Sequence, residues 1–298
     1  MSQLDMIYYR IIMDQYFLPS LLEAFIGHLK SQDKSQHTIV AYKKDLEQFI
    51  GFLTTREKND IREIKKDDIE AFINKLIAEN YTKKSASRKL NSIRTFFRDL
   101  KIQGLIDTNP SLDISHPKYA QTPARILSKL EYRALRDLAK EDPRTYALVE
   151  LLLQTGIKIG ELAELRLADI KEETIHIRPY GKNIERDVPL NKPAKKSLDD
   201  YMKVRPNLDN DHVFITRNGH PLLIRNIRQI IDRCFREVEI ENATVNDLRN
   251  TFIAHQLMRG ASLEYIARVV GHRRLSSTER FLNLVKEETE RKEKLGQL

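Results

Sequence analysis

The first third of the chain carries apolar residues at helical spacing. Four stripes recur at intervals of three or four positions, and each predicts one amphipathic helix. The stripes are Leu22, Phe25, Ile26 and Leu29; Ile39, Tyr42, Leu46, Phe49, Ile50 and Leu53; Ile69, Phe72, Ile73 and Leu76; and Ala86, Leu90, Ile93, Phe97 and Leu100. We therefore expect a four-helix domain over residues 18–108, behind an N-terminal extension of residues 1–17.

The fourth stripe has a polar face opposite its apolar one. A residue two positions from an apolar one lies about 200° away around the helix axis. The residues so placed are Lys84, Arg88, Asn91, Thr95 and Arg98. Such a face is most often plain solvated surface, but its basic side chains also suit contact with phosphates.

A proline-rich segment separates this domain from the rest of the chain. Residues 109–125 contain Pro110, Pro117 and Pro123 and little periodicity, which predicts an extended linker. Residues 126–298 then form a second domain.

The second domain mixes helical and strand patterns. One helix is expected to start at the capping box of Ser128 and Glu131, and another at Asp142 and Pro143. Alternating residues predict a β-hairpin, with a third short strand possible beside it. The hairpin strands are 174–178 and 185–190, and later helical stripes occupy 222–238, 245–258, 263–270 and the charged tail. The fold class is therefore mainly α with a small β-sheet.

The charge balance points to a polyanionic partner. The chain has 51 Lys and Arg against 43 Asp and Glu, a formal net charge of +8, although a basic surface alone is compatible with many soluble proteins. The single cysteine, Cys234, excludes an internal disulfide framework and a cysteine zinc site. No apolar run is long enough to span a bilayer, and the N-terminus lacks a signal-peptide pattern. We expect a soluble cytoplasmic protein without metal or cofactor.

Several segments together resemble one known family. In the first domain these are HTIVAYKKDLEQFIGFL and SASRKLNSIRTFFRDLKIQGLIDTNPS; in the second they are TGIKIGELAELRLADI, GKNIERDVPL, NDLRNTF and VVGHRRLSSTERFLNL. They occur in the order found in tyrosine site-specific recombinases, and the chain resembles the Xer and phage-integrase branch over almost its whole length.

The resemblance implies a fold and a chemistry. Such proteins clamp duplex DNA between a helical core-binding domain and a catalytic domain, and a terminal helix docks on a neighbouring protomer. A tyrosine attacks a backbone phosphate, two arginines hold its oxygens, a hairpin lysine acts as general acid and histidines assist, without a metal. On this pattern Lys182 matches the lysine, Arg249 the second arginine and His272 a histidine. Glu161 and Asp247 are expected to hold other groups in place.

Three positions depart from the family pattern. Lys158 stands for the first arginine and loses its bidentate fork. Asn246 stands for a histidine and does not titrate near neutrality, and Asn250 replaces a second histidine. Phe281, nine residues after His272, stands for the nucleophilic tyrosine and has no oxygen to attack with.

These departures predict a sequence-specific DNA-binding protein of recombinase fold that has lost strand cleavage. We expect a transcriptional repressor or regulator, phage- or mobile-element-borne, or an accessory recombination factor, with a homodimer or higher oligomer as a possible form. The candidate DNA contacts are Lys83, Lys84, Arg88, Asn91, Arg94, Arg98, Lys158, Lys182, Arg249, His272, Arg273 and Arg274.

Two alternatives remain open from the sequence. One is an active recombinase that uses another hydroxyl or a nucleophile given in trans; the hydroxyls in question are Tyr180, Tyr265, Ser276, Ser277 and Thr278. The other is an interaction protein that pairs with an active recombinase through its terminal helix and binds DNA only weakly.

Overall fold

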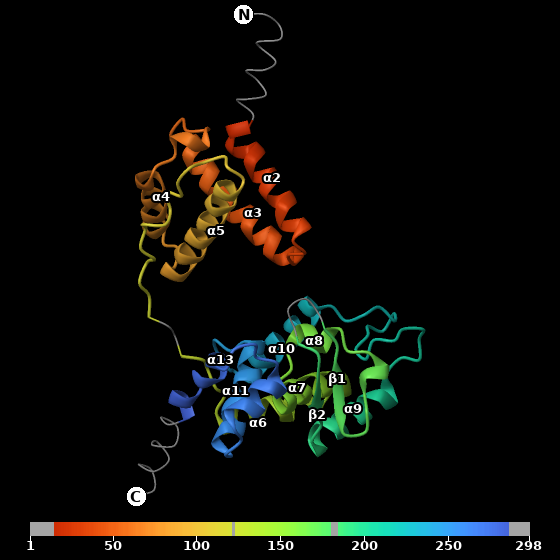
Figure 1. The fold of residues 1–298 in the computed structure, drawn as a ribbon. Coiled ribbons are helices and arrows are strands. Elements are labelled where there is room, and N and C mark those ends of the chain that lie inside the picture. The colour runs from red at the N-terminus through yellow and green to blue at the C-terminus, as the bar shows by residue number, and fades with distance from the viewer. Residues whose placement is uncertain (1–14, 121–122, 180–183, 286–298) are drawn as a thin grey trace, which may run out of the picture. The chain divides into compact units, whose positions relative to one another are not determined.

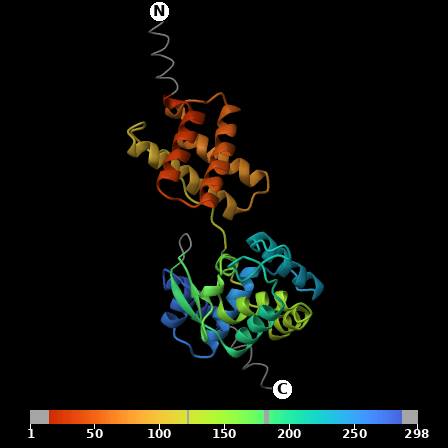
Figure 2. The ribbon, with the colours of Figure 1, turned by 90° about the vertical axis from the view of Figure 1, so that its right-hand side faces the viewer.

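The computed structural model describes residues 15–120, 123–179 and 184–285. The chain divides between residues 121 and 122 into two compact units, each with its own core (Figures 1 and 2). Helices dominate both units, and the second also holds a two-stranded sheet. The predicted fold class is confirmed. None of the helices in the described ranges is both long and apolar enough to cross a bilayer.

The first unit is the predicted four-helix domain. Its helices are α2 (Leu18–Ser31), α3 (Gln36–Thr54), α4 (Lys66–Ala78) and α5 (Lys83–Ile102), with a short 3-10 turn at Ile61–Glu63. Ser35 and Thr82 cap α3 and α5 through their hydroxyls, as small polar residues at helix starts commonly do. The apolar stripes form the core, except that Tyr42 is only partly buried.

The segment after α5 stays on the first unit for several residues. Arg94 of α5 donates from Nε to the Ser111 carbonyl at 3.1 Å and from Nη2 to the Leu112 and Ile114 carbonyls. Its Nη1 is hydrogen-bonded to Nε2 of His116, and Nδ1 of the same ring lies 2.9 Å from the Ser87 hydroxyl. Ile114 is buried in the core of the first unit. The first half of the segment expected as linker is therefore tied to α5.

The second unit contains the remaining elements. The helices are α6 (Lys129–Ala139), α7 (Pro143–Thr155), α8 (Ile159–Ala163), α9 (Lys192–Val204), α10 (Ile224–Glu237), α11 (Val245–Met258), α12 (Leu263–Val270) and α13 (Ser276–Glu279), and the strands are β1 (Thr174–Ile177) and β2 (Arg186–Pro189). Both expected helix starts are confirmed, with the capping box at Ser128 and the side chain of Asp142 as a cap. Helix α9 is an element that the apolar pattern did not predict.

The predicted hairpin is confirmed, and its register fixes which side chains face inward. Strands β1 and β2 are antiparallel, with Ile175 opposite Val188 and Ile177 opposite Arg186. Within the described ranges the sheet has two strands, and further pairing is limited to isolated bridges such as the one between Ile170 and Ile175. The charged tail, expected as a final helix, lies mostly outside the described residues.

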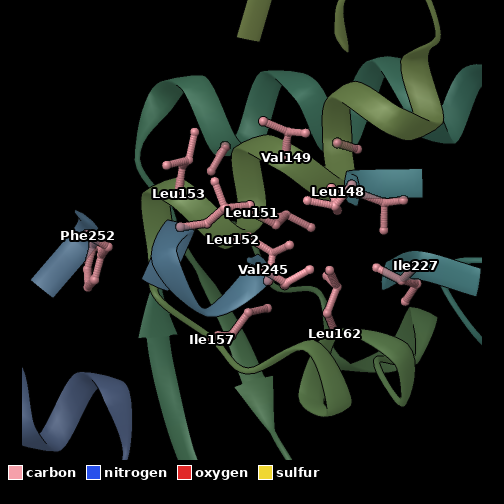
Figure 3. Packing of buried hydrophobic residues seen from close by; sticks show 14 of the residues in the cluster. Leu148, Val149, Leu151, Leu152, Leu153, Ile157, Leu162, Ile227, Val245 and Phe252 are labelled. Carbon is pink, nitrogen blue, oxygen red and sulfur yellow. The ribbon is translucent and has the colours of Figure 1, made fainter. Parts of the chain in front are cut away.

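Helix α7 forms the middle of the second core. It packs against α9 and α11, and Figure 3 shows Leu148, Leu151 and Leu152 of α7 close to Leu162, Ile227 and Val245 from three other helices. Cys234 is buried on α10. This core supports the loops that follow α7 and α12, where the candidate site is built.

Candidate nucleic-acid site in the second unit

Two glycines end the helices that lead into the candidate site. Gly156 follows α7 with φ 64° and Gly271 follows α12 with φ 70°, a left-handed conformation that side chains disfavour. A Cβ on Gly156 would overlap the Phe252 ring, and one on Gly271 would lie 2.8 Å from the Arg186 guanidinium. The turns therefore require glycine, and they are followed by Lys158, two residues after Gly156, and by His272, the residue after Gly271.

Arg249 ties these two turns together. It lies on α11 and is 8% exposed. Its Nη1 donates to the Gly156 carbonyl and its Nη2 donates to the Val270 carbonyl at 2.7 Å. Burial lowers its pKa to about 10, so the guanidinium still carries its charge at neutral pH. The retained family arginine thus holds both sides of the site.

Arg186 and Glu161 form a buried ion pair beneath the same turns. Arg186 donates from Nη1 to Oε1 of Glu161 at 3.0 Å, from Nη2 to Oε2 at 2.8 Å, and from Nε to the Val269 carbonyl at 2.7 Å. The Glu161 carboxylate also accepts from the backbone N–H of Lys158 at 2.8 Å. Burial raises the pKa of Glu161, but the hydrogen bonds and charge of Arg186 hold it below its usual value. One ion pair therefore fixes β2, the start of α8 and the end of α12.

Cations outnumber carboxylates at this site. Burial and, after it, the charges of Arg249, Arg280, Lys158 and Arg186 together lower the pKa of His272 to about 4. The pKa of Lys158 is also lowered, first by burial and then by neighbouring arginines, although Glu161 at 3.9 Å opposes this. Such mutual repulsion is relieved when an anion binds among the cations. The site is therefore suited to a phosphate.

The position of the family nucleophile is part of the hydrophobic core. Phe281 is 0% exposed and belongs to the core cluster of the second unit. The Arg280 guanidinium lies 5.0 Å from the centre of its ring. Thr278 is also fully buried, and its hydroxyl lies 2.8 Å from Nδ1 of His272. An apolar ring thus occupies the position that the sequence prediction assigns to the nucleophile.

The other predicted residues are placed as follows. Asn246 is exposed in the first turn of α11 and borders a groove that Arg228 and Arg236 of α10 also line. Asn250 donates to Asp247, and Asp247 accepts from the backbone N–H of Thr244, the N-cap residue of α11, in a capping box. The structural roles expected for Asp247 and Glu161 match these contacts. Arg273 and Arg274 are exposed, and Lys182 lies outside the described residues.

The basic residues of α5 take different roles. Lys83, Lys84, Asn91 and Arg98 are exposed, whereas Arg94 is used to tie down the segment that follows α5. Arg88 is exposed and binds the buried carboxylate of Asp45.

The sequence interpretation missed two cations, Arg186 and Arg280. The strand alternation contains a signal for Arg186, because that residue shares the buried face of β2 with Val188. Arg280 adjoins Phe281 in a family segment, but no spacing rule selects it. Among the described residues no group of three His, Cys, Asp or Glu side chains could hold a metal ion.

Comparison with family models gives two matches. The model described as phage integrase family matches residues 125–288, and the model described as phage integrase, N-terminal SAM-like domain, matches residues 22–104. The two models fall on the two structural units.

Individual proteins and structures agree with these matches. Tyrosine recombinase XerC of Thermodesulfovibrio yellowstonii is 33% identical over 271 residues, which cover 86% of this chain and 88% of that protein. A structure of a lambda integrase dimer bound to a COC′ core site has a TM-score of 0.75 at 20% identity and covers 92% of this chain and 80% of the other. The Tn1549 transposon integrase with a tyrosine-to-phenylalanine change, in complex with transposon right end DNA, has a TM-score of 0.72 at 18% identity, with 91% and 98% covered. At these identities the two structures support the fold alone.

The buried ion pair generates a prediction on stability. Glu161→Gln leaves the Arg186 charge buried without its partner, so we expect the second unit to lose about 3 kcal/mol of stability. Differential scanning calorimetry of the full chain measures this as a lower melting temperature for one transition. Glu164→Gln, at an exposed position three residues along, is the matched control and should change little. Equal melting of the two variants would contradict the role given to the pair.

The lowered pKa of Glu161 adds a pH dependence. Because the carboxyl titrates below its ordinary value of 4.5 in the folded protein, its contribution to stability is present above pH 4.5. That contribution is lost as the pH falls through the lowered pKa. The parent should therefore lose stability on acidification below pH 4.5 more steeply than Glu161→Gln does.

The cation excess generates a prediction on His272. The free protein should hold this imidazole neutral at pH 7, because its pKa is about 4. A phosphate bound among the cations should raise that pKa, so binding should take up protons and strengthen as the pH falls toward 5. An NMR pH titration, with the His272 signal assigned by His272→Asn, tests this with and without duplex DNA. An unchanged midpoint would mean that no phosphate enters the site.

Proposed function

The chain belongs to the phage integrase family of tyrosine recombinases, and from this premise we propose that it binds duplex DNA at specific sequences without cutting it. The observation that carries the proposal is Phe281, a fully buried ring without an oxygen at the family's nucleophile position. The role that fits is a transcriptional repressor or regulator, or an accessory recombination factor of a phage or mobile element. It would act in the cytoplasm as a dimer or higher oligomer on DNA.

The cations of the site support binding. The pKa of His272 is lowered by the charges of four cations, Lys158, Arg186, Arg249 and Arg280. Glu161 is the carboxylate paired with Arg186. A backbone phosphate would balance this excess. Lys158 keeps the charge of the family arginine but offers one point of contact instead of a planar fork. Binding therefore depends on features that this chain retains.

Catalysis depends on features that the chain lacks. Losing one bidentate donor to the transition state costs about 3 kcal/mol, on the scale of one oxyanion-hole contact. Losing the attacking oxygen removes the covalent route altogether, because a benzene ring cannot attack phosphorus. Asn246 cannot shuttle a proton near neutrality. The missing oxygen is thus the decisive loss.

Solved structures of similar fold include DNA complexes of substituted integrases. The Tn1549 integrase is seen in complex with DNA in one form with arginine changed to lysine and in another with tyrosine changed to phenylalanine. Lambda integrase is seen as a dimer on a core site and as a tetramer on a Holliday junction. We propose that this chain, with similar substitutions, likewise forms a complex with DNA. We also propose that it forms oligomers there.

A second candidate is an active recombinase with another nucleophile. It is favoured by the 33% identity to a XerC protein and by the Thr278 hydroxyl beside His272. Thr278, however, is 0% exposed, so DNA cannot reach it without local opening. Tyr265 is 43% exposed on α12, with its ring beside Arg268, and Tyr180 lies outside the described residues.

The test starts from DNA that the protein itself selects. Fragments bound in cells are mapped, and the recovered site is tested by electrophoretic mobility shift against scrambled DNA. We expect a shift specific to the site. Nicked suicide substrates, which trap the covalent intermediate of an active recombinase, should give no band that survives denaturing electrophoresis. A surviving band that disappears in a Tyr265→Phe or Thr278→Val variant would favour the second candidate.

The three departures from the family pattern generate a graded prediction. Phe281→Tyr alone should remain without detectable cleavage, because Lys158 and Asn246 still lack the fork and the titrating ring. Adding Lys158→Arg and Asn246→His should restore covalent trapping on the same nicked substrate. Cleavage by the single variant would show that the other two substitutions matter little, and Phe281→Leu serves as the control without an oxygen.

A further inference from the structure

The first unit contains a second charged cluster, centred on a buried carboxylate. Asp45 lies on α3 and is 1% exposed. Its Oδ1 accepts from Nη2 of Arg88 at 2.8 Å and from Nζ of Lys89 at 2.9 Å. Its Oδ2 accepts from Nη1 of Arg88 and from the Ser92 hydroxyl at 2.8 Å. Each carboxylate oxygen thus accepts two hydrogen bonds, so the acid is fully occupied and held between α3 and α5.

Only some of the hydrogen-bond donors of Arg88 bind Asp45. The side chain of Arg88 is 53% exposed, whereas those of Asp45 and Lys89 are 2% and 8% exposed. Two of the five N–H donors of an arginine bind Asp45, and the remaining three belong to a guanidinium that reaches solvent. A bidentate pair fixes both the position and the plane of that guanidinium.

The exposed side of the cluster faces a groove lined by several cations. Its lining is Ala41, Lys44, Asp45, Gln48, Tyr81, Arg88 and Lys89. Gln48 donates to the Tyr81 hydroxyl at 3.0 Å, and the Lys89 ammonium lies 5.7 Å from the centre of the Tyr81 ring. Three cations against one carboxylate leave this groove with an excess of positive charge. It therefore favours an anionic occupant.

We propose that this groove binds a backbone phosphate of duplex DNA and that Asp45 is a positioning residue that orients Arg88 for that contact. The inference rests on the proposed function and assigns an acidic residue to DNA binding. Asp45 does not touch the phosphate. Its role is to order the guanidinium before DNA arrives, so that binding does not have to immobilise a long flexible side chain.

Two physical pictures predict opposite results for Asp45. If only net charge mattered, removal of an acid near the groove would strengthen binding to a polyanion. If Asp45 orients Arg88, its removal releases the guanidinium and weakens binding, although the protein becomes more positive. Ordering of one such side chain corresponds to a change in affinity of about threefold to tenfold.

The experiment uses the full-length chain and a fluorescein-labelled duplex oligonucleotide of random sequence, with anisotropy measured over a series of KCl concentrations. Asp45→Asn should weaken binding by about fivefold and reduce the slope of log K against log salt by about one, the loss of one phosphate contact. Glu47→Gln removes an exposed acid from the same helix and is the control; it should bind as the parent does or slightly more tightly.

A second variant covers the case in which Asp45→Asn does not fold. Arg88→Lys keeps the charge and removes the fork, so it should also bind several-fold more weakly while its circular dichroism melt stays close to that of the parent. Parent-like or tighter binding by a folded Asp45→Asn, or parent-like binding by Arg88→Lys, would overturn the inference alone. A parent protein that gives no binding to any duplex would overturn both the inference and the proposed function.

Discussion

The buried ion pair between Glu161 and Arg186 holds the candidate site together. A charge without solvent requires a partner and further hydrogen bonds, and this pair has both, through the Lys158 backbone and the Val269 carbonyl. Because Arg186 comes from the hairpin, Glu161 from α8 and Val269 from α12, three elements remote in sequence are fixed at one point. The glycine at position 271 follows from the same constraint, since the guanidinium leaves no room for a Cβ there.

Once these turns are fixed, the site has the electrostatics of a phosphate pocket, and on the proposed function it lacks a nucleophile. Arg249 spans the two turns and remains charged, and His272 is held neutral by burial and then by the surrounding cations. Phe281 contributes to the core and offers no oxygen. Three residues differ from those that the family pattern predicts: Lys158, Asn246 and Phe281. Each keeps the size, charge or hydrogen bonding of the expected residue but lacks one of its chemical capabilities. This set of replacements is the reason for proposing a protein that binds DNA without cutting it.

Local patterns predicted most of the fold. The apolar stripes gave all four helices of the first unit, and the bounds expected for α11 and α12 agree with the structure, because amphipathic periodicity determines which face is buried. Helix α9 was missed because it buries only four residues of a largely charged segment. The two glycine turns were likewise not predicted, since their need for glycine comes from Phe252 and Arg186, which are distant in sequence.

The candidate site was predicted less completely than the fold. Family segments located Arg249, His272 and Phe281, but Arg186 and Asp45 act through partners 25 and 43 to 47 residues away. Arg94 illustrates the opposite case, because its place on a basic helix suggested DNA while its hydrogen bonds tie down the chain after α5. Ion pairs and hydrogen bonds between helices decide which cations remain available to bind DNA. The periodicity of a single sequence carries no information about these pairings.

The central claim is that DNA binding persists without covalent chemistry, and mass spectrometry of one sample tests it most directly. The protein is incubated with a nicked duplex carrying its selected site, and the mixture is measured under native and then denaturing conditions. We expect a protein–DNA complex in the native spectrum and only the unmodified chain mass after denaturation. A denatured species that retains the mass of a nucleotide strand would contradict it.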